Sequence, residues 1–111
     1  MKNLKLNKKI CINLQIEGIH YWKDCDIEEV EYLKYPHRHI FYIEIHKEVN
    51  HNDRDIEIIC FKKEVINYFK SQPVNFKNKS CEDIAEHLLI KFNACYVKVL
   101  EDNENGAIVT I

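Results

Sequence analysis

Two histidines separated by one residue lie where the sequence predicts a strand, and histidine readily binds transition metals. His37 and His39 precede an alternating stretch, residues 40–46, that is rich in β-branched and aromatic side chains. Because alternate side chains of a strand point to one face, both imidazoles share a face that continues through Phe41 and Ile43. Neutral imidazole is a good zinc ligand, and two at this spacing can bind one ion.

A third histidine ends the apolar face of the preceding segment. The even positions of residues 10–22 are mostly apolar, and His20 is one of them. Antiparallel pairing across the connection would bring His20 beside the other two. Three imidazoles with an open fourth position are typical of a catalytic or ligand-binding zinc site. The alternatives are that these are core histidines satisfied by hydrogen bonds, or that a bulge at Gly18 turns His20 outward.

The composition is that of a single ordinary domain. The chain has 111 residues, of which 46% are hydrophobic and 31% charged, and its formal net charge is -2. This charge provides no general attraction to nucleic acid or to a membrane surface. Residues 1–9 are basic and lead into a strand pattern rather than a signal peptide, so we expect a cytoplasmic protein without a membrane span.

The cysteines do not form a recognisable framework. There are five, an odd number, and no Cys-x-x-Cys spacing occurs. Neither a set of disulfides nor a cysteine-based zinc knuckle is indicated. We expect most of them to be buried free thiols.

The remaining pattern predicts the elements that must position these histidines. Hydrophobic periodicity and turn residues predict a strand within residues 1–22, an acidic solvated loop at 23–35 and a second strand at 38–49. A turn at 50–53, a short strand at 55–60, a helix at 61–71 and a loop at 72–79 are expected to follow. A second helix begins at Ser80, where Asp83 completes an approximate capping box. We expect one domain over residues 1–111.

The last segment predicts a hairpin. Residues 95–101 alternate as a strand, the Asn105–Gly106 pair predicts the turn, and residues 107–111 return. Glu101 ends the apolar face of the first of these strands. It is either an ordinary carboxylate at a strand end or an anion directed into a pocket.

The order of these elements and motifs resembles the tunnelling fold of the 6-pyruvoyl- and 6-carboxy-tetrahydropterin synthases, over nearly the whole chain. In that family a histidine on the first strand and a His-Gly-His pair on the second bind zinc, and they match His20, His37 and His39, with Arg38 in place of the glycine. Ser80-Cys81-Glu82 is similar to the family's Thr-Ser-Glu, its terminal glutamate falls on Glu101, and Glu57 is a weaker match to an aspartate.

The resemblance implies a fold, a cofactor and a ligand for this divergent, short chain. The fold would be α+β, an antiparallel four-stranded sheet with two helices on one face, closed into a barrel by several subunits as a homo-oligomer. Zinc would be the cofactor. The ligand would be a pterin, a deazaguanine or a purine nucleotide, gripped by Glu101 through paired N–H bonds.

Parts of the family's reaction machinery are missing. The family places a catalytic cysteine a few residues before its histidine pair, whereas residues 31–35 contain none and Cys25 is offset. The loop at 72–79 lacks the family's Asp and His, so no group for proton transfer is evident.

Three functions therefore remain open. The first is a zinc-containing binder, scavenger or sponge without the synthase reaction. The second is an active synthase-like lyase in which Cys25, His46 or His51 substitutes as the base. The third is a metal-free structural or interaction module.

Overall fold

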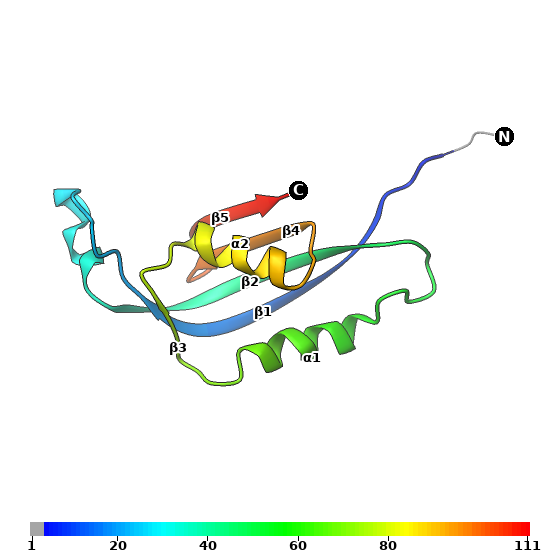
Figure 1. Cartoon of the computed structure of the whole chain (residues 1–111), viewed down its shortest axis with the longest axis horizontal. Coiled ribbons are helices and arrows are strands. Elements are labelled where there is room, and N and C mark those ends of the chain that lie inside the picture. The colour runs from blue at the N-terminus through cyan, green and yellow to red at the C-terminus, as the bar shows by residue number, and fades with distance from the viewer. Residues whose placement is uncertain (1–3) are drawn as a thin grey trace.

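The computed structural model describes residues 4–111 as one five-stranded sheet packed against two α-helices (Figure 1). The strands are β1 (Lys8–His20), β2 (His37–Val49), β3 (Val74–Lys77), β4 (Tyr96–Glu101) and β5 (Asn105–Thr110), and the helices are α1 (Ile58–Tyr68), α2 (Cys81–Lys91) and a 3-10 helix at Glu28–Lys34. The strand order is β3-β1-β2-β4-β5 and the sheet is open. The α+β class is confirmed. No helix within residues 4–111 is long and apolar enough to cross a membrane.

The two long strands β1 and β2 determine the register of the sheet. They pair antiparallel along all 13 residues, with His20 opposite His37 and Gly18 opposite His39. Gly18 pairs regularly with β2, so no bulge turns His20 away from the apolar face. The register shift beside it affects only the pairing of β1 with β3.

One hydrophobic core lies between the inner face of the sheet and both helices. Its sheet side includes Ile16, Phe41 and Val99, and its helix side includes Val65 of α1 and Leu88 of α2, each at most 1% exposed. Burying each such side chain contributes about 1.5–3 kcal/mol to folding. The alternating pattern therefore orients one face of every long strand inward, including the positions that carry the histidines.

The predicted start of α2 is confirmed. Ser80 Oγ accepts the backbone N–H of Asp83, and the Asp83 carboxylate accepts the N–H of Ser80. A cap of this kind stabilises a helix by about 0.5–2 kcal/mol. It places Cys81, the first helical residue, beside the end of β4.

The predicted strand at 55–60 is wrong, because α1 begins at Ile58 and ends at Tyr68. The carboxylate of Glu57 accepts the N–H groups of Ile59 and Cys60, which are donors that a helix start leaves unsatisfied. This cap stabilises the helix although the isoleucines of the segment favour a strand.

The sheet has five strands rather than the predicted four, and it is not wholly antiparallel. The segment predicted as a loop at 72–79 contains β3, which pairs parallel with the end of β1 and buries Phe76. The connection predicted as a solvated loop at 23–35 contains the 3-10 helix, none of whose residues is buried.

The hairpin is confirmed, but its turn lies before the predicted Asn-Gly pair. Asp102 and Asn103 have φ of 54° and 60°, and the Glu104 N–H donates to the Glu101 carbonyl. Short polar side chains tolerate this left-handed conformation. Gly106 lies within β5, where an added Cβ would clash with the backbone carbonyl of Val99.

The expectation that most cysteines are buried is also wrong. Cys25 and Cys81 are buried and Cys95 is partly exposed, whereas Cys11 and Cys60 are exposed. All five are free thiols.

We expect Gly18→Ala to destabilise the protein by about 1–3 kcal/mol, because a small-to-large change in a packed interior forces its neighbours to shift. A Cβ at Gly18 would lie 2.5 Å from a Phe76 ring carbon and 2.9 Å from one of Phe41. Urea unfolding measures the difference. Asn13→Ala, on the exposed face of the same strand, is the control and should change stability by less than about 0.5 kcal/mol. Equal effects of the two substitutions would contradict this account of Gly18.

Candidate metal centre

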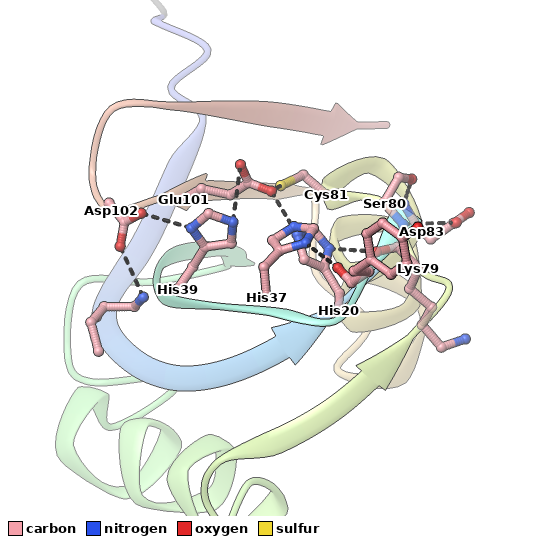
Figure 2. A network of polar contacts seen from close by, with 11 residues as sticks. His20, His37, His39, Lys79, Ser80, Cys81, Asp83, Glu101 and Asp102 are labelled. Atoms are coloured by element: carbon pink, nitrogen blue, oxygen red, sulfur yellow. Dashed lines mark hydrogen bonds and ion pairs between the residues drawn. The ribbon is translucent and has the colours of Figure 1, made fainter. Parts of the chain in front are cut away.

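Three histidines and one glutamate converge at one end of the sheet. The donor atoms of His20, His37, His39 and Glu101 all lie within 4.8 Å of one another, and this group could hold a metal ion (Figure 2). His20 is the last residue of β1, His37 the first of β2, and Glu101 the last of β4. The structure thus brings together all four residues that the sequence singled out. Their roles as metal ligands or ligand-binding groups stay predictions.

Each imidazole is oriented by a hydrogen bond at its Nδ1 atom. The contacts are His20 to the Lys79 carbonyl at 2.9 Å, His37 to the Tyr35 carbonyl at 2.8 Å, and His39 to the Asp102 carboxylate at 2.7 Å. A carbonyl or carboxylate oxygen only accepts, so Nδ1 carries the proton in each ring and Nε2 is left for an ion. Such outer hydrogen bonds are the usual support of metal-bound histidines.

Two of the inward-facing nitrogens lack a partner. His20 Nε2 and His39 Nε2 are buried without a hydrogen bond. Glu101 Oε2 lies 2.9 Å from His20 Nε2, but this contact lacks hydrogen-bond geometry, so in the neutral ring a lone pair faces a carboxylate oxygen. Leaving a buried polar group unpaired costs about 1–3 kcal/mol. A cation between these atoms would satisfy them, and the donor set suits a divalent metal.

Without a metal, the His20 ring can bind a proton and pair with the Glu101 carboxylate. Burial acts to lower the pKa of His20, but the contacts with Glu101 and with the Lys79 carbonyl outweigh it and raise that pKa above its ordinary value. The contact with His20 and the proximity of His39 hold the pKa of Glu101 low despite its burial. His20 and Glu101 therefore stabilise each other as an ion pair when both are charged.

The cluster forms one wall of a pocket of about 570 Å³. His20, His37 and Glu101 line it on one side, and Trp22 and Leu33 provide apolar surface. A pocket of about 580 Å³ elsewhere is lined by polar and apolar residues, among them Lys62 and Ile66 of α1, and contains none of the four residues. The pocket beside the histidines is the one that can present a ligand to a bound metal.

Two further residues, Cys81 and Asp102, belong to this centre. From the sequence, Cys81 entered only through the resemblance of Ser80-Cys81-Glu82 to the family's motif, and Asp102 was not singled out. The Cys81 thiol lies 3.7 Å from Glu101 Oε2 and donates to it, and burial together with the Glu101 charge raises the pKa of Cys81 to about 12. The Asp102 carboxylate accepts from both His39 and the Ile40 N–H. Their contacts with the site are evident only from the fold, because Cys81 and Asp102 are distant in sequence from the residues that they contact.

The residues considered as substitute bases lie elsewhere in the chain. Cys25 is buried in the connection after β1, with its thiol 3.6 Å from the Val30 carbonyl. His46 contacts Glu44, and His51 lies 3.4 Å from Asp55. None of the three lines the pocket beside the cluster, so within residues 4–111 of one chain they do not supply a base.

The metal-free protein should be most stabilised by His20 and Glu101 between about pH 4.5 and 6.5, the ordinary pKa values of the two groups. The raised pKa of His20 means that its contribution is lost as pH rises through that pKa, and the lowered pKa of Glu101 means that its contribution is lost as pH falls through that one. With metal bound, stability should instead rise with pH above 6.5, because only neutral imidazoles bind a metal.

Thermal unfolding of chelator-treated and metal-loaded protein across this pH range measures the effect. Glu101→Gln should flatten the profile of the metal-free form. A metal-free wild type whose profile matches that of Glu101→Gln would contradict the ion-pair account.

Purified without chelator, the protein should carry one equivalent of zinc, and His39→Ala should lose it. Asp102→Asn should weaken zinc binding about 10–100-fold, because the charge that supports His39 is removed. Elemental analysis and titration with a zinc indicator measure both. His46→Ala is the matched control and should bind as wild type does; equal loss in this control would argue against the cluster as the site.

No protein-family model and no curated protein matches the chain. The four converging residues are therefore the basis on which a function can be inferred.

Proposed function

We propose that this chain is a zinc-containing protein of the tunnelling-fold type that captures a pterin, deazaguanine or purine-type ring without the standard synthase reaction. One observation carries the proposal. Three imidazoles are fixed through their Nδ1 atoms so that their Nε2 atoms face one point beside a carboxylate, at the wall of a pocket.

Zinc is the metal that best suits these donors. It prefers four ligands in a tetrahedral arrangement, and imidazole nitrogens with a carboxylate oxygen are among its usual ligands. His20, His37 and His39 would hold the ion. Bound there, zinc supplies a Lewis acid that attracts an oxygen or nitrogen of a ligand.

Glu101 is the residue that would recognise the ring. Its side chain is 26% exposed and reaches the pocket. A carboxylate accepts two parallel N–H bonds in a planar fork, and its charge strengthens both. An amino group and the adjacent ring N–H of a pterin or guanine present such a pair of donors. Trp22 and Leu33 offer apolar surface to the faces of the ring.

We base capture without turnover on the groups that line the pocket within the described residues. Cys81 is the thiol nearest to Glu101 among the lining residues, and its raised pKa keeps it protonated near neutral pH. Residues 72–79 contain no histidine or aspartate. A general acid or base needs a pKa near the working pH. A scavenger, a sponge or a regulatory binder fits this set of groups.

The chain is also proposed to assemble as a homo-oligomer. Within the described residues, β5 pairs only with β4, and Ile108 on this edge strand is 56% exposed. Leu4 and Leu6, which precede β1, are 71% and 67% exposed. Open strand edges with apolar side chains favour pairing with another copy.

Guanosine or neopterin should raise the melting temperature of the zinc-loaded protein, since a ligand at 100 times its Kd stabilises the folded state by about 2.7 kcal/mol. Glu101→Ala should abolish this shift because the paired acceptor is lost. Glu48→Ala, an exposed position on β2, is the control and should preserve it. No shift with either compound in zinc-loaded wild type would count against the proposal.

A further inference from the structure

We infer that the pocket beside the metal centre selects an unphosphorylated base or nucleoside and rejects its phosphate esters. This inference rests on the proposed function and narrows its ligand class. It follows from the charges that line the pocket and from the way in which the start of α2 is capped.

The lining of the pocket is strongly acidic. The pocket is lined by four carboxylates and a single lysine. The carboxylates are those of Asp24, Glu82, Asp83 and Glu101, and the lysine is Lys79. A bound divalent ion beside Glu101 still leaves this lining net negative. A phosphate monoester carries about two negative charges near neutral pH and would be repelled.

The lysine is not placed to offset this charge. Its backbone carbonyl accepts the His20 Nδ1–H, whereas its side chain extends away from the three histidines (Figure 2). Lys79 is exposed. Its ammonium group is therefore solvated and screened, and it makes no ion pair with the carboxylates of the pocket.

The helix start that adjoins the pocket also carries negative charge that disfavours an anion. A free helix N-terminus binds phosphate through its unsatisfied N–H groups and its dipole. In α2 the Asp83 N–H donates to Ser80 Oγ at 3.0 Å, and the Ser80 N–H donates to the Asp83 carboxylate at 3.2 Å. Glu82 adds a second negative charge to the same turn. The cap satisfies one donor of the first turn, and the two carboxylates offset the positive end of the helix dipole that would attract a phosphate.

The same pocket contains independent evidence of a ligand site rather than a mere acidic surface. His20 is 7% exposed, and its Nε2 is unpartnered on the side that faces the cluster. Tyr21, Trp22 and Leu33 add a wall suited to a flat ring. A polar, metal-facing end and an apolar wall accommodate a base, and the acidic rim disfavours a phosphate tail.

Calorimetric titration of the zinc-loaded 111-residue chain with guanosine and with guanosine 5′-monophosphate tests the inference, because the two probes differ only in the phosphate. At low ionic strength guanosine should bind at least about tenfold more tightly. The ratio of the two affinities should decrease as salt is added, since screening weakens the repulsion between the phosphate and the carboxylates.

Variants identify the source of the selectivity. Asp24→Asn combined with Glu82→Gln should bring the two affinities closer together and leave the Ser80–Asp83 cap intact. Glu86→Gln, also on the exposed side of α2 but outside the pocket lining, is the matched control and should keep the wild-type ratio. Zinc content measured after each titration shows that the phosphate has not removed the metal.

The outcomes separate this inference from the function on which it rests. Monophosphate binding as tight as guanosine binding would overturn the charge selection and leave the ring-binding proposal standing. An unchanged ratio in the double variant would also overturn it. If zinc-loaded protein binds neither guanosine, its monophosphate nor neopterin, both the selection and the proposed function fail.

Discussion

The candidate site depends first on the register between β1 and β2. His20 lies opposite His37 and Gly18 opposite His39, and all of these positions lie on the face that packs against the helices. A shift of one residue would move every side chain of β1 to the other face. The buried row that includes Ile12, Leu14 and Ile16 makes such a shift costly, since it would expose three side chains that are at most 6% accessible. The core thereby fixes the histidines in place.

The site also depends on the orientation of each imidazole ring, which is set by segments outside the sheet. The Lys79 carbonyl precedes α2, the Tyr35 carbonyl ends the β1–β2 connection, and Asp102 belongs to the hairpin turn. Each orients one imidazole, so the segment before α2, the long connection and the hairpin turn together determine the geometry of the histidine cluster. Asp102 also holds the start of its own turn, because its N–H donates to the Ile40 carbonyl while its carboxylate accepts the Ile40 N–H. Distortion in any of these segments would be transmitted to the ring that it supports.

Period-two alternation was sufficient to predict that His20, His37 and His39 share a face, and the Ser80 cap was readable from local sequence alone. The start of α1 was not, because the isoleucines around Glu57 resemble a strand and only the observed cap reveals the helix. Strand β3 is four residues long, too short for periodicity to identify. Asp102 and Cys81 reach the site through contacts between residues 63 and 20 positions apart, respectively, and no local pattern encodes such contacts. The resemblance to the tunnelling-fold family stays a proposal.

Charge balance connects the metal to the ligand. Three neutral imidazoles would leave both positive charges of a zinc ion uncompensated, and a buried charge is stable only when it is paired. Glu101 would supply one negative charge directly, and Asp102 would supply another through its contact with His39. A zinc ion held here would therefore be neutralised by the protein and would not need an anionic ligand. Of these two carboxylates, Glu101 is also one of the four that make the pocket unfavourable for phosphate. A flat base with N–H donors would satisfy Glu101 without adding negative charge, so the proposed metal and the proposed uncharged ligand are compatible with the same set of carboxylates.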